Sequence, residues 1–148
     1  MLKIVYGDLM DAKEDIIGHQ VNCKGVMGSG VALGIRKKFP EAYNAFLSLG
    51  ADDNNLGRMQ TVFIPNKRKV IANLFGQKAF GKNGKFTDYD GLGTALHELA
   101  GFARMHNLSV ALPYKIGAGL GGGDWGIIEQ MILFEFSDVP ITLYCLKQ

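Results

Sequence analysis

The sequence has few of the residues that build disulfide frameworks and metal centres. Its 148 residues include two cysteines, Cys23 and Cys145, and three histidines, His19, His97 and His106. Two cysteines give no disulfide framework, and scattered histidines without cysteine or carboxylate partners at metal-ligand spacing do not indicate a metal site. We therefore expect no metal, no redox cofactor and a cytoplasmic location.

Long hydrophobic runs and a strong charge excess are also missing. No apolar stretch reaches the roughly 20 residues that a membrane-spanning helix needs, and the first residues alternate as in a strand, unlike a signal peptide. The formal net charge is +2, which is too small to indicate a nucleic-acid partner by itself. The hydrophobic content of 47% is typical of a globular protein. We expect one domain over residues 1–148, with no membrane contact.

Glycine, in contrast, is abundant, and its most informative cluster lies between Gly117 and Gly123. Five glycines fall within these seven residues. They follow an apolar run at residues 110–113, which is typical of a strand, and precede an amphipathic helix that starts near Asp124. Glycine lets main-chain N–H groups approach a ligand closely, and a following helix adds free N–H groups and the positive end of its dipole. This combination is typical of a phosphate-binding loop.

A second loop of the same kind spans residues 25–30. It lies between a strand-like segment that ends at Asn22 and a helix-like segment that runs from Val31 to Lys38. Two such loops predict two contacts to one diphosphate. Neither loop is followed by Gly-Lys-Ser/Thr, so the signature of the phosphate-loop ATPases is absent.

Strand-like and helix-like segments alternate along the chain, with one hairpin in the middle. The expected strands are 2–6, 16–22, 59–64, 69–74, 109–113 and 139–146, and the expected helices are 30–48 (interrupted at Pro40), from Thr87 or Asp88 to about His106, and 124–136. Residues 76–87 are predicted to form a mobile loop. The alternation predicts an α/β fold, with a mixed, mostly parallel sheet of about six strands covered by helices on both faces. Ligands of such sheets bind at the carboxyl ends of the strands, where both glycine loops emerge.

Four motifs together resemble the macro domain family, which binds ADP-ribose on a three-layer α/β/α fold. They are Val-Tyr-Gly-Asp-Leu at residues 5–9, His-Gln-Val-Asn-Cys-Lys-Gly-Val-Met-Gly-Ser-Gly-Val-Ala at 19–32, Leu-Pro-Tyr-Lys-Ile-Gly-Ala-Gly-Leu-Gly at 112–121 and Ile-Thr-Leu-Tyr at 141–144. The similarity spans the whole chain, and the motifs follow the family's order. Within the family, the chain is similar to the branch with ADP-ribose 1″-phosphate phosphatases and enzymes that release ADP-ribose from acidic side chains.

The resemblance implies a set of residues that bind ADP-ribose. Asp8 and the main-chain N–H of Leu9 would contact adenine, Asn22 would hydrogen-bond the distal ribose, and Tyr144 would pack near adenine. The diphosphate would lie between two loops, Gly28, Ser29, Gly30 and Val31 on one side and Ile116, Gly117, Ala118, Gly119, Leu120 and Gly121 on the other. From the residues alone, Asp8 is equally a turn residue, Asn22 a brace of its loop and Tyr144 a core side chain.

Two residues are candidates for catalysis. His19, as a neutral imidazole, could act as general base or acid, or it could be a core histidine bonded to a main-chain carbonyl. Asp124 could activate water or bind the distal ribose, or it could cap the following helix. In the branch that cleaves ADP-ribosyl–glutamate esters, a lysine after the fourth strand attacks the sugar, and an acid in the loop that corresponds to residues 117–123 assists. Gln77 and Gly121 align with those positions, with Lys78 and Asp124 nearby.

The expected function is hydrolysis at the distal ribose, first of all of ADP-ribose 1″-phosphate to ADP-ribose and phosphate. One alternative is a module that binds ADP-ribose without turnover. Another is removal of ADP-ribose from protein or nucleic acid by Lys78, Asp124 or His19. A more distant alternative, a nucleotide hydrolase of another fold, predicts comparable binding of ATP and ADP-ribose.

Overall fold

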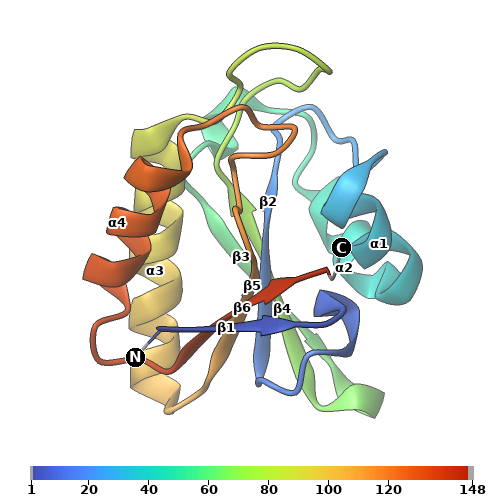
Figure 1. Cartoon of the computed structure of the whole chain (residues 1–148). Helices are drawn as coiled ribbons and strands as arrows, with labels where there is room; N and C mark the ends of the chain where they lie inside the picture. The colour runs from blue at the N-terminus through green and yellow to red at the C-terminus, as the bar shows by residue number, and fades with distance from the viewer. Residues whose placement is uncertain (1, 147–148) are drawn as a thin grey trace.

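A six-stranded sheet forms the centre of the computed structural model, which describes residues 2–146 (Figure 1). The strand order is β1-β6-β5-β2-β4-β3. Every neighbouring pair is parallel except β3 and β4, which form an antiparallel hairpin. The strands are β1 (Leu2–Tyr6), β2 (Ile16–Val21), β3 (Met59–Ile64), β4 (Lys69–Phe75), β5 (Val110–Pro113) and β6 (Ile141–Cys145). The predicted mixed, mostly parallel sheet is confirmed.

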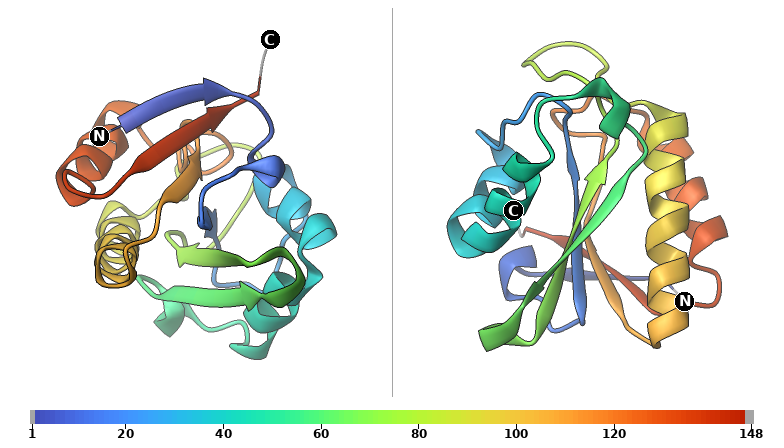
Figure 2. Two further views of the ribbon diagram at one scale, coloured as in Figure 1. Left: turned by 90° about the horizontal axis from the view of Figure 1, so that it is seen from below. Right: turned by 180° about the vertical axis from the view of Figure 1, so that it is seen from behind.

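Two pairs of helices cover the two faces of this sheet (Figure 2). Helices α3 (Tyr89–His106) and α4 (Trp125–Glu135) lie on one face, and α1 (Gly30–Lys38) and α2 (Pro40–Ser48) lie on the other. Short 3-10 helices follow β1 (Leu9–Asp11), precede β3 (Asp53–Asn55) and join β3 to β4 (Pro65–Lys67). The predicted three-layer α/β/α arrangement is therefore confirmed.

Strand β2 shows how the sequence divides between the two cores. Ile16 is fully buried among leucines and alanines of α3, whereas its neighbour Ile17 is buried against Ile35 of α1. This alternation follows from the two-residue period of a strand. It places Gly18 towards α3 and His19 towards α2. A buried core on each face holds the ends of the strands, and therefore the loops that follow them, in fixed positions.

Most element boundaries agree with the sequence to within two residues. Pro40 occupies the first turn of α2 and separates it from α1, as its missing N–H group predicts. Asp88, and not Thr87, caps α3, because its carboxylate accepts a hydrogen bond from the Gly91 N–H at 2.9 Å. Within residues 2–146, none of the helices combines the length and the apolar character needed to cross a membrane.

Candidate functional site

The two glycine loops emerge side by side from neighbouring parallel strands. The first glycine loop (residues 22–29) follows β2, and the second (residues 114–124) follows β5, which pairs with β2 through Ile16↔Val110. The loops face each other, because a Cβ atom placed on Gly30 would lie 3.5 Å from Leu120 Cδ1. Both lie at the top of the molecule in Figure 1. The expectation that both loops meet at one edge of the sheet is confirmed.

Free main-chain N–H groups gather where these loops meet. Among residues 2–146 no acceptor is found for the N–H groups of Gly28, Ser29, Gly30 and Val31 on one side and of Gly119, Leu120 and Gly121 on the other. Ser29 caps α1 by position, without a side-chain hydrogen bond, and Gly30 adopts a left-handed φ of 60° that a side chain would disfavour. Unpaired N–H groups at a helix start and in a glycine turn attract an anion.

A third loop (residues 76–88) spans the space above the two glycine loops. At one end, the Cys23 N–H donates to the carbonyl of Lys78 at 3.0 Å. At the other end, the N–H groups of Phe86 and Thr87 donate to the carbonyl of Gly121 at 2.7 and 2.9 Å. An antiparallel bridge joins Gln77 to Thr87. The prediction of a mobile loop is therefore wrong for its two ends, which hydrogen bonds fasten to both glycine loops.

The side chain of Gln20 connects the third loop to the second glycine loop. Its Nε2 donates to Gln77 Oε1 at 2.6 Å and to Thr87 Oγ1 at 2.9 Å, and Thr87 Oγ1 donates to the carbonyl of Gly117 at 2.7 Å. Gln20 Oε1 is buried and has no hydrogen-bond partner in the described part of the chain. Gln20 was not among the site residues expected from the sequence. The available signal was a polar side chain on the α3-facing side of an otherwise apolar strand.

His19 lies in the core under α2 and not among the loops. Asn73 Nδ2 donates to the carbonyl of Ala42 at 3.2 Å and to Gln60 Oε1 at 3.0 Å, so Asn73 Oδ1 faces His19 Nε2 at 2.6 Å. Only 1% of His19 is exposed, and burial lowers its pKa to about 4, although the bond to Asn73 opposes the shift. A side chain without access to solvent cannot exchange a proton with a substrate in the loops. The structure thus favours the core interpretation over the catalytic one, but the partner of the ring is the Asn73 side chain and not the expected main-chain carbonyl.

Asn22 and Asp124 both hold their own loops. Asn22 Nδ2 donates to the carbonyl of Val26 at 2.8 Å, and its Oδ1 accepts from the Lys24 N–H at 3.0 Å. Asp124 is the N-cap of α4, because its Oδ1 accepts from the Gly126 N–H at 2.8 Å. These are the bracing and capping roles that the residue types alone suggest. The Asp124 side chain is exposed, and its second oxygen has no partner among residues 2–146.

Asp8 follows β1, and Tyr144 lies in the neighbouring strand β6, where its carbonyl accepts from the Tyr114 N–H at the start of the second glycine loop at 2.8 Å. Asp8 Oδ1 accepts from the Met10 N–H at 2.9 Å, which starts the 3-10 helix at Leu9. A Cβ atom on Gly7 would lie 3.8 Å from the Tyr144 ring, so the ring is next to the Asp8 turn. The Tyr144 hydroxyl donates to Glu14 Oε1 at 2.6 Å, and burial together with this bond raises the Tyr144 pKa. The ring, and not the hydroxyl, is available beside Asp8.

Lys78 is an exposed lysine of the third loop, and it lies at the end of that loop that is attached to the first glycine loop. Its carbonyl is fixed by the Cys23 N–H, while its side chain is exposed. The neighbouring Gln77, which aligns with the family's lysine, has both ends of its amide bound: Nε2 donates to the carbonyl of Ala79 at 2.7 Å, and Oε1 accepts from Gln20. Lys78 is thus free to reach a ligand, whereas Gln77 is not.

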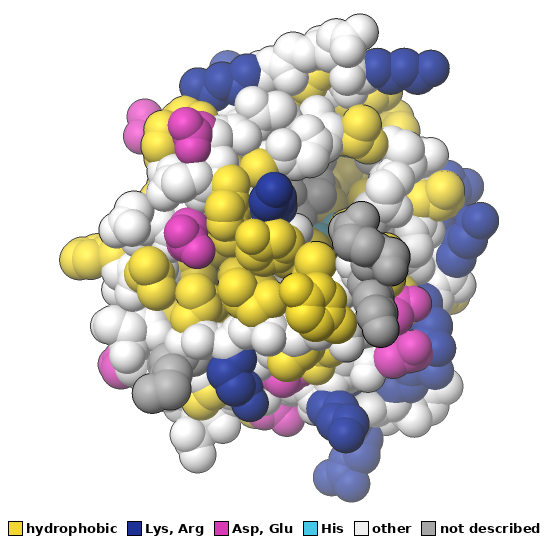
Figure 3. Space-filling model, in the orientation of Figure 1, with side chains coloured by type: hydrophobic (Ala, Val, Ile, Leu, Met, Phe, Trp, Pro, Cys, Tyr) yellow, Lys and Arg dark blue, Asp and Glu magenta, His cyan; other side chains and the backbone are white. Residues whose placement is uncertain are grey.

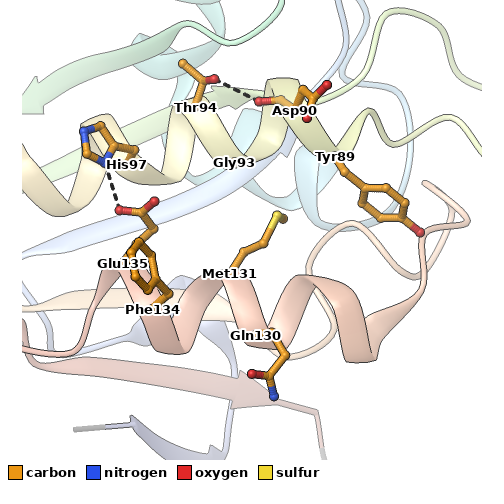
Figure 4. Close-up of a pocket in the computed structure, with 9 residues that line it drawn as sticks. All are labelled: Tyr89, Asp90, Gly93, Thr94, His97, Gln130, Met131, Phe134 and Glu135. Atoms are coloured by element: carbon orange, nitrogen blue, oxygen red, sulfur yellow. Dashed lines mark hydrogen bonds and ion pairs between the residues drawn. The ribbon is translucent and has the colours of Figure 1, made fainter.

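A separate groove lies on the outer surface between α3 and α4 (Figure 4). It encloses about 570 Å³, and the side chain of Met131 points into it while His97 and Glu135 pair at its end, with 2.9 Å between Nδ1 and Oε1. None of the glycine-loop residues lines it. Tyr89 lines its other end and accepts a hydrogen bond from the Asp124 N–H at 2.9 Å. The groove and the loops are therefore distinct features.

Comparison with known proteins gives consistent relatives. No family model matches the chain. Over 138 residues it is 32% identical to a DNA ADP-ribosyl glycohydrolase of Mycobacterium tuberculosis. This match covers 90% of this chain but only 38% of the length of that relative. It is 30% identical to an ADP-ribose 1″-phosphate phosphatase of Debaryomyces hansenii, with 97% of this chain and 98% of the relative covered.

Solved structures agree with the sequence comparison. The macrodomain of Mycobacterium tuberculosis DarG superposes with a TM-score of 0.81 at 30% identity, and the match covers 100% of this chain and 99% of that one. Both the full-length sequence match to the yeast relative and this superposition include the strands and loops that carry the four motifs. The chain therefore belongs to the macro domain family.

Proposed function

We propose that the protein binds ADP-ribose between its two glycine loops and hydrolyses a linkage at the 1″ position of the distal ribose. The observation that carries this proposal is the set of unpartnered N–H groups on the two facing loops. A diphosphate would satisfy these groups, and the two loops would then position the ribose that follows it. Adenine would lie beside Asp8 and the Leu9 N–H, against the ring of Tyr144.

The group attached at the 1″ position decides the reaction, and phosphate is the first candidate. A relative of nearly the same length is named ADP-ribose 1″-phosphate phosphatase, which supports it. In that reaction, water would supply the oxygen that ends on the released phosphate, and the ribose 1″-oxygen would take the proton. Asp124, whose second carboxylate oxygen is free, is the proposed base for this water. His19 has no part in this proposal because it is enclosed in the core.

Phosphate release and ligand binding together test the first candidate. Purified protein is incubated with ADP-ribose 1″-phosphate while free phosphate is followed, and calorimetry measures ADP-ribose affinity separately. Binding with phosphate release supports the phosphatase. Binding without release leaves a module that recognises ADP-ribose. Failure of ADP-ribose to bind at millimolar concentration would contradict the proposed site altogether.

A nucleic acid is the second candidate for the group at the 1″ position. The Mycobacterium tuberculosis relative is named DNA ADP-ribosyl glycohydrolase, and Lys78 is fixed by its main chain at the first glycine loop with its side chain exposed. Lys78 Nζ would then attack C1″, the bond from C1″ to the nucleic acid would break, and the nucleic acid would leave with a proton. Water would afterwards release ADP-ribose from Lys78, with Asp124 assisting the proton transfers. Lys78→Ala should abolish release of ADP-ribose from an ADP-ribosylated oligonucleotide and leave ADP-ribose affinity within about twofold. Equal rates in wild type and variant would remove Lys78 from the reaction.

A further inference from the structure

The third loop has an unusual composition for a surface segment. Residues 76–87 contain Lys78, Lys82 and Lys85 together with Phe80 and Phe86, and no aspartate or glutamate. The Phe80 side chain is 52% exposed, and all three lysines are exposed. The third loop forms an arch at the top of the molecule in Figure 1, and in Figure 3 Lys and Arg side chains lie at both sides of this top. The one acidic residue of the third loop, Asp88, caps α3 at its end, so residues 76–87 present only cationic charges beside an exposed aromatic ring. Such a segment is suited to a polyanion with flat groups.

The position of this loop is fixed relative to the proposed ribose site. Hydrogen bonds from Cys23 at one end and to Gly121 at the other attach it to both glycine loops. Near its second end, Lys85 Nζ lies 4.1 Å above the ring of Tyr89, which in turn accepts from the Asp124 N–H. Phe80 and Lys82 lie on the exposed stretch between these two attachments.

We propose that the third loop binds the single-stranded nucleic acid that carries the ADP-ribosyl group. In this arrangement Phe80 stacks on a base adjacent to the modified one, and Lys82 contacts a backbone phosphate. Single strands offer unpaired base faces for stacking, whereas the bases of a duplex are already stacked on one another. A small phosphate group would use neither side chain. This inference rests on the proposed ADP-ribose site and assigns its substrate class as ADP-ribosylated polynucleotide.

Binding of labelled oligonucleotides to the full chain tests this surface. The probes are fluorescein-labelled dT and rU strands of about 12 nucleotides and a hairpin duplex of the same length, measured by anisotropy at low salt. Phe80→Ala should weaken single-strand binding about 5- to 20-fold, because stacking on an aromatic ring contributes at least that much per base. Lys82→Gln should reduce the slope of log K against log salt by about 0.7. The two strand types show whether the loop distinguishes DNA from RNA.

Matched variants at other surfaces provide the controls. Phe134→Ala removes a ring of 79% exposure on α4, and Lys67→Gln removes a charge in the hairpin at the opposite end of the sheet. Both should bind the strands like wild type. In all four variants calorimetry should give the wild-type affinity for ADP-ribose, because none of these side chains contacts the glycine loops in the proposal.

Several results would overturn the inference. The first is that the protein binds ADP-ribose but no single strand. The second is that Phe80→Ala and Phe134→Ala have equal effects, and the third is that the duplex binds as tightly as the single strands. Equal binding of an oligoglutamate peptide with the same dependence on Phe80 would indicate a protein partner in place of a nucleic acid. Loss of ADP-ribose binding in the wild type would instead contradict the proposed function, whatever the oligonucleotides do.

Discussion

Gly122→Ala is the sharpest test of how the third loop is fastened. Gly122 has a φ of 71°, and a Cβ atom there would overlap the carbonyl oxygen of Gly84 and lie 3.0 Å from Lys85 Cα. Main-chain atoms cannot rotate away as a flexible side chain can, so the third loop would have to move. A left-handed φ costs a non-glycine residue about 1–2 kcal/mol. Movement would also break two hydrogen bonds to the Gly121 carbonyl, each contributing about 0.5–1.5 kcal/mol.

Urea unfolding of Gly122→Ala should therefore show a loss of about 2–5 kcal/mol in the free energy of unfolding. For a domain of this size, the melting temperature should fall by roughly 5–15 °C. Gly119→Ala is the matched control, because a Cβ atom at Gly119 meets nothing within 4 Å and its φ is not left-handed. It should change stability by no more than about 0.5 kcal/mol. Equal stability of the two variants would refute a fixed third loop and the inference drawn from it.

Three further substitutions address single side chains. His19→Gln removes a group whose pKa is lowered to about 4 by burial. Because the unfolded chain takes up the His19 proton at higher pH than the folded protein does, the free energy of unfolding of the wild type should fall by roughly 3 kcal/mol between about pH 6.5 and pH 4. In urea unfolding, His19→Gln should lose about that much less over the same range, and His97→Gln is the exposed control. Asp124→Asn should keep the α4 cap and its melting temperature yet lose turnover by about 100-fold or more, whereas Asp124→Ala should also lose about 1 kcal/mol of stability. Tyr144→Phe removes the hydrogen bond to Glu14 and should cost about 1 kcal/mol in unfolding free energy without weakening ADP-ribose binding, measured by calorimetry.

Local sequence patterns predicted the parts of the fold that depend on local physics. Alternation and helical spacing gave the strands and helices, and glycine chemistry gave the two loops that face each other across Gly30 and Leu120. The cap at Asp124 also follows from residue type and position. The elements, the loops and the cap need no knowledge of which strands are neighbours, whereas the facing of the two loops depends on β5 pairing with β2.

The depth of His19 and the connections of Gln20 depend on strand order and could not be predicted in the same way. Both lie on β2, and their partners come from segments more than 50 residues away: Asn73 for His19, and Gln77 and Thr87 for Gln20. The alternation of β2 indicates opposite faces for the two side chains, but not which of them reaches the loops. That depends on β4 lying beside β2 and on the third loop folding back over both glycine loops.

The pairing of β1 with β6 ties the beginning of the chain to its last strand. Leu2 lies beside Ile141, and β6 is the strand that separates β1 from the rest of the sheet. During synthesis, β1 has no place to dock until Cys145 has been made, and the outer edge of β5 stays unpaired until then. A chain without β6 consequently loses the contribution of two strands, which leaves a sheet with an open, aggregation-prone border at β5.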